Sequence, residues 1–421
     1  MADAPPPDQS ADDPTSGSEQ EIVPTMLAEI ATALGRCTYP VSQSRVLVEK
    51  AADAYGYKSG VIALLPTLSI VGNRQTGGIA MQELTGSYRF DQIASAQAEV
   101  AVACSGTKPP EDVLRSLRAI PNQTPLFPTW LRILGYGATA LGFACLFQMT
   151  FQSLAIAAML GILVGVALLW GNPGRQVSAL MPVVLTFASA VVVSVVAVWA
   201  NIPDPARLAV IPVLALIPGA ALATSVIELF SGDMTAGSSR LIYAIMLLLS
   251  ITFAFTLAVQ LVGAGENGLT DVTAQTAPPW VVWLGVVIFG LGYSLFYCTP
   301  LNLWIPTLTL LVFSHLVLNL CQTVMTPPLS AGVTIALALI VAWVLNDRTG
   351  TGPVSLVLFL PTFWMIVPGS TGFVALTGVV EKNQDLSDLG LQVALTVVSM
   401  SVGIMIASLI YPHLQKRVGR H

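Results

Sequence analysis

Long apolar runs separated by short polar segments occupy the chain from about residue 128 onward. A bilayer core about 30 Å thick is crossed by roughly 20 helical residues, so each run has the length of one membrane-spanning helix. The pattern therefore predicts a polytopic α-helical membrane protein with ten transmembrane helices, near Leu131–Met149, Gln152–Trp170, Val177–Ala200, Leu208–Phe230, Leu241–Val262, Trp280–Tyr297, Leu301–Leu320, Leu329–Leu345, Pro353–Leu376 and Leu389–Tyr411.

The pattern before residue 128 is that of an ordinary soluble segment. Residues 1–20 are rich in Pro, Ser and Asp, which predicts a disordered tail. Residues 21–122 predict a small cytoplasmic α+β domain, because helical spacing occurs there together with a short β-type stretch. The expected elements are two short strands around Pro66 within Gly60–Gly72, and helices at Ile22–Leu34, Val46–Tyr55, Phe90–Cys104 and Glu111–Ile120. Residues 413–421 form a short basic tail after the last span.

The two halves of the membrane part, residues 128–264 and 277–412, align with each other at one shift of about 150 positions. The matched pairs include Pro128 with Pro278, Trp130 with Trp280, Gly135 with Gly285, Gly142 with Gly292, and Pro218-Gly219 with Pro368-Gly369. Five spans per half is an odd number, so the second half starts on the opposite side of the membrane. The sequence therefore predicts two inverted five-helix repeats, an architecture that recurs among secondary transporters.

Each repeat contains an apolar span interrupted by proline and glycine, at Leu216–Ala220 and at Ile366–Thr371. Proline removes a backbone donor and glycine loosens the helix, so backbone groups become available inside the membrane. Such groups, with nearby hydroxyls, can hold the carboxylate and ammonium of a zwitterion. The candidate substrate-binding residues here are Pro218, Gly219, Pro368, Gly369, Ser370 and Thr371. The alternative interpretation is a pair of packing kinks.

Polar residues in or beside the spans give further candidates. Asn302 and Asn319 lie at the edge of and within the seventh span, where polar side chains tend to face the bundle interior or the solute. Glu228, Asp233 and His315 are candidates for coupling to a proton, because groups that move between buried and exposed states change their proton affinity. The alternatives are solvated or ion-paired acids, including a pair of Asp233 with Arg240, and a packing histidine.

Composition supports the membrane class and excludes several others. The chain is 54% hydrophobic and 10% charged, with a mean hydropathy of +0.75, which is too apolar for a soluble protein of 421 residues. Five cysteines without paired spacing and three histidines predict no metal site and no cofactor. The net charge of −5 gives no indication of a nucleic-acid partner. No ATP-binding motif is present, so an ion gradient, with the proton as the first candidate, or the solute's own gradient is the expected source of energy.

Basic residues near the span ends predict the orientation. The side that carries more Lys and Arg is normally cytoplasmic, so both termini are expected in the cytoplasm and the protein in the plasma membrane. The expected inner residues are Arg132, Arg175, Arg240, Arg348, Lys416, Arg417 and Arg420, against Arg207 and Lys382 outside. Glycine-rich helix faces would allow close packing within one protomer or between protomers, so a homo-oligomer is open.

Several short motifs resemble one known family. Ser44-Arg45-Val46-Leu47-Val48-Glu49, Ala54-Tyr55-Gly56 and Leu65-Pro66-Thr67 in the first domain, and Ile217-Pro218-Gly219, Ser231-Gly232-Asp233, the segment from Gly237 to Arg240 and Val367-Pro368-Gly369-Ser370-Thr371 in the membrane part, are similar to the threonine/serine exporter family of ThrE type. The resemblance implies a cytoplasmic domain followed by ten spans, and export of threonine and serine driven by the proton gradient. Cys37-Thr38-Tyr39-Pro40 and the absence of histidine from the first domain depart from the family pattern.

Three other functions remain open from the sequence. A membrane-anchored hydrolase would act through the first domain, with Ser42, Ser44, Thr67, Ser69 or Cys104 as nucleophile, although no histidine is there to activate it. An exporter of another solute, such as a small peptide or a lipid-linked precursor, would need a wider, more apolar cavity. A structural assembly protein would not need the repeated breaks.

Overall fold

The computed structural model describes residues 14–57, 60–73, 78–170, 175–200, 205–262, 277–349, 355–367 and 386–417. The chain forms two compact units. Unit 1 consists of Met1–Ser87 with Ala96–Asn122, and unit 2 consists of Tyr88–Ser95 with Gln123–His421. Helix α3 (Phe90–Ser105) contributes its first residues to unit 2 and the rest to unit 1.

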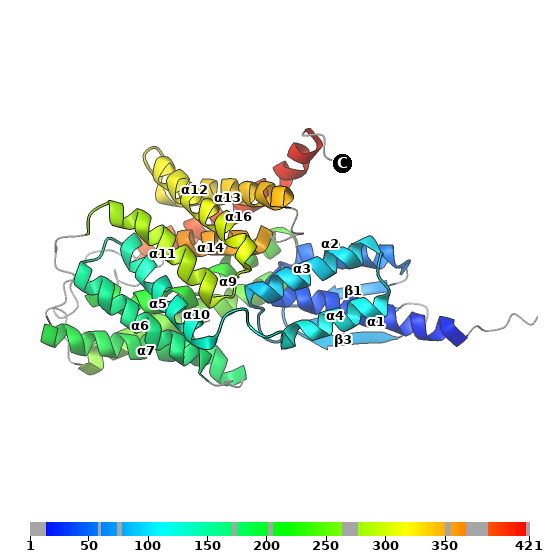
Figure 1. The fold of residues 1–421 in the computed structure, drawn as a ribbon, viewed down its shortest axis with the longest axis horizontal. Helices are drawn as coiled ribbons and strands as arrows, with labels where there is room; N and C mark the ends of the chain where they lie inside the picture. The colour runs from blue at the N-terminus through cyan, green and yellow to red at the C-terminus, as the bar shows by residue number, and fades with distance from the viewer. Residues whose placement is uncertain are drawn as a thin grey trace, which may run out of the picture. The chain divides into compact units, whose positions relative to one another are not determined.

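Unit 1 is built around helix α1 (Pro14–Arg36), whose apolar residues are fully buried at Met26, Leu27 and Ile30. The helix packs against a three-stranded antiparallel sheet in the order β1-β2-β3 and against α2 and α4 (Figure 1). The bounds of these elements are α2 Val41–Ala54, β1 Gly60–Leu64, β2 Leu68–Asn73, β3 Ile79–Glu83, α4 Pro110–Ala119 and the 3-10 turn η1 Ile120–Asn122.

The helices and the two strands lie close to where the sequence places them, but helix α2 begins at Val41 and not at the predicted Val46, and there are two further differences. Strand β3 was missed, because Ile79-Ala80-Met81-Gln82-Glu83 contains only one β-branched residue and exposes Ile79 and Met81. Helix α1 begins at Pro14, so residues 14–20 of the predicted disordered tail are helical. Proline is favoured at a first helical position, and lengthening an existing helix costs less than starting one.

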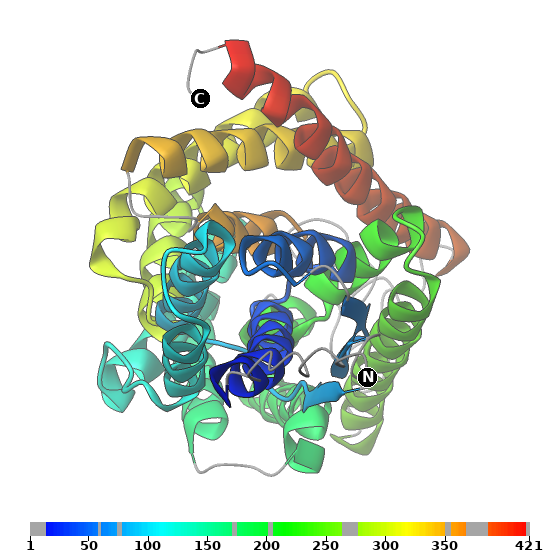
Figure 2. The same ribbon diagram turned by 90° about the vertical axis from the view of Figure 1, so that its right-hand side faces the viewer.

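Unit 2 is helical throughout its described part (Figure 1). Its helices are α5 Thr129–Leu146, α6 Phe151–Leu169, α7 Arg175–Ala200, α8 Pro205–Val210, α9 Gly219–Phe230, α10 Met234–Val262, α11 Trp280–Phe296, α12 Trp304–Gln322, α13 Pro327–Thr349, α14 Ser355–Val367 and α16 Leu386–Arg417, with 3-10 turns η2 Ile211–Leu216 and η3 Leu301–Leu303. The principal pairings are α5 with α11 and α13 with α16; the latter pair, orange and red, can be followed in Figures 1 and 2.

Within the described residues, six helices are long and apolar enough to cross a membrane. A seventh span results if the bent pair Arg207–Leu216 and Gly219–Phe230 is counted as one. Trp280–Phe296 and Val357–Ile366 are apolar but shorter. The chain is therefore a polytopic membrane protein, while ten spans in two inverted repeats stays a prediction.

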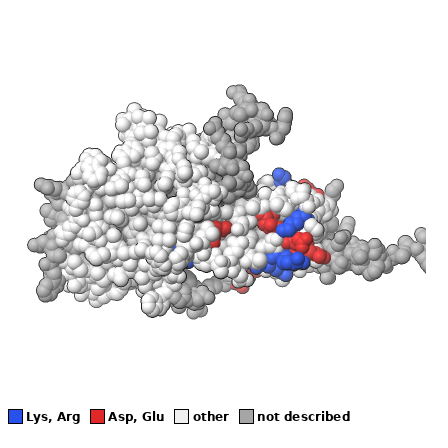
Figure 3. All heavy atoms as spheres, viewed as in Figure 1, with Lys and Arg blue, Asp and Glu red and all other residues white. Residues whose placement is uncertain are grey.

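The surface of unit 2 agrees with contact to lipid. In the view of Figure 3 the described charged side chains gather over unit 1, and the described surface of unit 2 is almost free of them. Large apolar side chains of α10 are exposed instead, among them Ile242, Ile245, Met246, Leu249 and Phe253. Apolar side chains facing outward are stable when hydrocarbon surrounds them.

Helices α5 and α11 cross at glycines that allow backbone contact. A Cβ atom added at Gly135 would meet the Gly292 carbonyl at 2.9 Å, and one at Gly285 would meet the Gly142 carbonyl at 3.0 Å. A Cβ at Gly142 would lie 2.5 Å from the Phe289 nitrogen, and one at Gly292 would lie 2.5 Å from the Thr139 nitrogen. The contacted positions fall along α11 as those on α5 rise, so the two helices are antiparallel. Small residues of this kind are what lets membrane helices approach closely.

The same two helices also end alike. After α5 the Met149 N–H donates to the Ala144 carbonyl, and after α11 the Thr299 N–H donates to the Ser294 carbonyl. The residues between, Gln148 at φ 51° and Cys298 at φ 58°, adopt the left-handed conformation that such a Schellman ending requires. Glycine is the usual residue there, because a side chain costs about 1–2 kcal/mol in this conformation.

Candidate transport site

The span that contains Pro218 is broken in the structure, as the sequence predicts. The 3-10 turn η2 ends at Leu216, Ile217 is extended at φ −65° and ψ 133°, and α9 begins at Gly219. The helix axes on the two sides are bent by 50°. Pro218 sits in a tight turn at φ −77° and ψ 42°, closed by the Gly219 N–H donating to the Ile217 carbonyl at 2.8 Å. Pro218 and Gly219 are both buried.

Hydroxyl groups from two other helices hold the segment before the break. The Tyr136 hydroxyl of α5 donates to the Pro212 carbonyl at 3.0 Å, and the Ser189 hydroxyl of α7 donates to the Ala209 carbonyl at 2.8 Å. A carbonyl released from a regular helix needs a partner inside a membrane protein, because lipid offers none. These two bonds therefore allow a non-helical backbone inside the membrane part.

A buried ion pair follows at the far end of α9. Glu228 is fully buried, and its Oε2 lies 3.1 Å from Nε of Arg240, whose side chain is 19% exposed. The turn Ser231-Gly232-Asp233 returns the chain into α10, with Gly232 at φ 85°. Gly237 lets α10 approach α9, since an added Cβ would lie 2.8 Å from the Ser225 carbonyl. This approach brings the guanidinium to the carboxylate.

Helix α16, from the second half of the membrane part, also contacts α9. The Ser401 hydroxyl lies 3.3 Å from the Ala223 carbonyl and donates to the Val397 carbonyl at 2.8 Å as well. The broken span is thus in contact with elements of both halves of the sequence.

The other predicted site residues are not brought to the break. Asn302 in η3 and Asn319 in α12 are exposed, and the Asn319 amide donates to the His315 carbonyl at 3.0 Å. His315 is 9% exposed and packs edge-to-face on Trp283, with ring centroids 4.9 Å apart. Helix α12 packs mainly on α11, α13 and α14. The second break, Pro368, Gly369, Ser370 and Thr371, lies outside the described residues.

Sequence reasoning missed the residues that support the break. Tyr136, Ser189 and Ser401 are hydroxyl-bearing residues in otherwise apolar helices, and that isolation in an apolar run was a signal for a buried hydrogen bond. It also proposed Asp233 as the partner of Arg240. The ion pair that the structure gives to Arg240 is with Glu228, which precedes Asp233 in the chain and lies near the end of α9.

The candidate nucleophiles of unit 1 do not form a hydrolytic site in the described residues. The Ser69 hydroxyl donates to the Ala28 carbonyl at 3.0 Å and lies 2.9 Å from the Thr32 hydroxyl. The Cys104 thiol donates to the Leu47 carbonyl, and burial raises its pKa, which disfavours the reactive thiolate. In the part of the chain that the structure describes, no three His, Cys, Asp or Glu residues form a metal site.

Comparison with known proteins gives one match. No curated protein and no solved structure matches the chain. The model of one protein family, described as "Putative threonine/serine exporter" (ThrE), matches residues 25–262, more than half of the chain and including the broken span and the Glu228–Arg240 pair. This is a family of transporters and not of enzymes. The chain therefore belongs to the threonine/serine exporter family.

Proposed function

We propose that this protein is a secondary active exporter of small neutral amino acids, threonine and serine, whose solute site is the break between η2 and α9. The observation that carries the proposal is a buried proline–glycine break inside a span of an exporter-family chain. Broken helices near the bilayer midplane are a recurring way for transporters to offer backbone groups to a solute.

The break suits a zwitterion. The amino end of α9 carries the positive end of the helix dipole and N–H groups without helical partners, which favour a carboxylate. Carbonyls of the η2 turn favour an ammonium group. Pro368, Gly369, Ser370 and Thr371 would complete the site from the second repeat. Asn302 and Asn319 would join it in a conformation that turns the exposed face of α12 toward the solute.

Reciprocal contacts between α5 and α11 support the inverted repeat. Gly135 contacts Gly292, and Gly285 contacts Gly142. The shift of 150 positions pairs Gly135 with Gly285 and Gly142 with Gly292, so it converts the first contact into the second. A set of contacts that maps onto itself when the two partners are exchanged is the mark of a two-fold axis. The matching helix ends at Gln148 and Cys298 are also 150 positions apart. Two halves related in this way can give inward-open and outward-open states of similar energy.

Coupling to protons is assigned to Glu228 in the first place. A fully buried carboxylate is stable as an anion only while a cation neutralises it, and Arg240 has that role here. Protonation of Glu228 would release Arg240 and change the contact between α9 and α10. Asp233, in the turn after α9, and His315, buried in α12, are the secondary coupling candidates. In this proposal the protein lies in the plasma membrane with both termini in the cytoplasm.

The test is efflux of preloaded threonine from cells that lack other exporters. Gly219→Leu and Gly369→Leu are compared with the wild type and with Ser238→Leu, a control that places the same side chain at an exposed position of α10. We expect efflux from the wild type and the control, and at least tenfold less from both break variants at equal membrane expression. Full efflux from the break variants would move the site elsewhere. No efflux from the wild type would reject threonine as the solute and bring small peptides forward.

A further inference from the structure

A cleft of about 450 Å³ with a mixed polar and apolar lining lies in unit 2, apart from the break. Its walls come from the first turns of α3, the segment before α5 and the residue that precedes η3; they are Asp91, Ala94, Ser95, Gln123, Thr124, Leu126 and Pro300. The volume lies within the range of small-molecule sites in proteins. The mechanism proposed for the break uses none of these residues.

The walls of the cleft are held in place by several contacts. The Phe90 N–H donates to the Tyr297 carbonyl at 2.8 Å, and the two rings stack with centroids 5.3 Å apart. Gln92 accepts a hydrogen bond from the Arg89 N–H at 3.0 Å, which is the backward half of a capping box. The start of α3 is therefore fixed to the end of α11, and a ligand would meet a preformed site.

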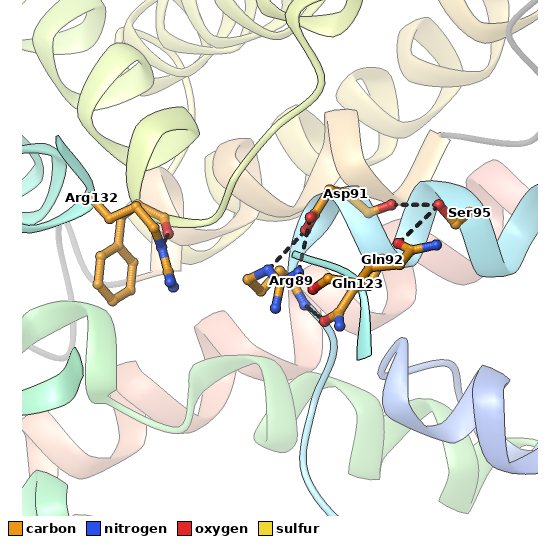
Figure 4. Close-up of polar contacts among 7 residues, drawn as sticks. Arg89, Asp91, Gln92, Ser95, Gln123 and Arg132 are labelled. Atoms are coloured by element: carbon orange, nitrogen blue, oxygen red, sulfur yellow. Dashed lines mark hydrogen bonds and ion pairs between the residues drawn. The ribbon is translucent and has the colours of Figure 1, made fainter. Parts of the chain in front are cut away.

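Arg89 connects two walls of the cleft. Its Nε and Nη2 donate to the two carboxylate oxygens of Asp91 at 3.1 and 3.0 Å, and Nη2 also donates to the Gln123 carbonyl at 2.8 Å (Figure 4). The Ser95 hydroxyl donates to the Asp91 carbonyl at 3.0 Å. Asp91 is thus a nearly buried carboxylate, with its side chain 9% exposed, at the edge of the cleft.

Donor capacity remains unused around this ion pair. Among the described residues Nη1 of Arg89 has no hydrogen-bond partner, and Arg132 uses only Nε, which donates to the Phe296 carbonyl at 3.1 Å (Figure 4). The Arg89–Asp91 pair beside the cleft presents one cation and one anion, the charges complementary to the carboxylate and the ammonium of a zwitterion.

We infer that this cleft is a second binding site for a zwitterionic α-amino acid, where the chain holds the solute outside the break. The ligand carboxylate meets the unused Nη1 of Arg89, whose side chain is bonded to the lining residues Asp91 and Gln123, and its ammonium meets oxygens of Asp91, Ser95 and Thr124. The inference rests on the proposed amino-acid export. It adds a capture site at the end of the membrane part where α5 begins and α11 ends.

The test measures, in the full-length protein, how fast a maleimide labels a cysteine introduced into the cleft. Ser95→Cys and, separately, Thr124→Cys are made with Cys104 and Cys321 changed to serine, because the other three cysteines are buried. Saturating threonine is expected to slow maleimide labelling of both positions at least tenfold. Ala98→Cys, exposed on the same helix but outside the cleft, is the control and should react at an unchanged rate.

Two analogues and one further variant decide how the result is read. Threoninol, without the carboxylate, and 3-hydroxybutyrate, without the ammonium, should each need at least ten times the concentration for equal protection. Protection that vanishes when Gly219→Leu is added would come from the break and overturn the inference. Efflux without protection would overturn the cleft alone and leave the exporter standing, whereas protection without efflux would support the cleft and reject threonine transport.

Discussion

Glu228 and Arg240 form a buried ion pair whose stability depends on both charges. A carboxylate with no exposed surface would be expensive to bury alone, and the guanidinium 3.1 Å away offsets that cost. In the proposed coupling, gain of one proton by the carboxylate would remove this attraction. Arg240 keeps 19% of its side chain exposed, so it has a route to water when released.

Replacement of Glu228 by glutamine tests this role. The amide cannot bind or release a proton, so we expect threonine efflux to lose its dependence on the pH gradient and to fall about tenfold or more. Efflux is measured at several external pH values. Glu49→Gln, an acid-to-amide change at an exposed position of α2, is the matched control and should behave as the wild type. Unchanged efflux and pH dependence in a double variant with Asp233→Asn would reject acid coupling at this end of α9.

The reactivity of Cys104 tests whether its thiol is structural or a nucleophile. Burial raises its pKa above the usual value of 9.0, and the nearby charge of Lys50 opposes this only in part. A raised pKa means less thiolate at pH 8, so alkylation by iodoacetamide should be slower than that of Ser105→Cys, the exposed neighbour. The rate should continue to rise above pH 9. Faster alkylation of Cys104 than of the control at pH 8 would revive the hydrolase alternative.

Among the helices and strands, those with strong periodicity were predictable and their mutual contacts were not. The helices of unit 1 and the hairpin around Pro66 follow from spacing and turn chemistry. Strand β3 depends on pairing with β2, which its own residues do not indicate. The stacking of Phe90 on Tyr297 joins positions far apart in the chain, and the local sequence around either residue does not predict it. The proline–glycine break was predictable because its chemistry is local.

The crossing of α5 and α11 predicts that alanine destabilises the protein at one glycine of α11 and not at another. Alanine at Gly292 would press its Cβ to 2.5 Å from a backbone nitrogen, whereas at Gly290 it would meet the ends of Leu308 and Leu311, which can move. Overpacking against backbone costs about 1–3 kcal/mol, while alanine otherwise favours a helix over glycine by up to about 1 kcal/mol. Thermal unfolding in detergent should therefore occur at lower temperature for Gly292→Ala and nearly unchanged for Gly290→Ala. Equal melting of the two variants would contradict a backbone-tight crossing.

At the scale of the whole molecule, the number of spans decides whether the repeats are inverted. The length and hydropathy of the described helices give six or seven spans, because α5, α11 and α14 are shorter or less apolar than the rest. The repeat alignment gives ten, since each of these three helices has a counterpart in the other half. Short helices can cross a membrane when neighbours cover their ends, so length alone does not separate the two counts.

The side of the membrane on which residue 267 lies distinguishes an odd from an even number of spans in the first half. With five spans in the first half, Asn267 is on the side of the membrane opposite to both termini; if α5 does not cross, four spans precede Asn267 and it shares the side of the amino terminus. We expect an impermeant maleimide to label Asn267→Cys in intact cells, and to label Ser10→Cys only after the membrane is opened. Labelling of Asn267→Cys that also requires opened membranes would remove the odd span count. The two-fold contacts between α5 and α11 would then relate helices packed inside the protein, and alternating access would have to arise without an inverted repeat.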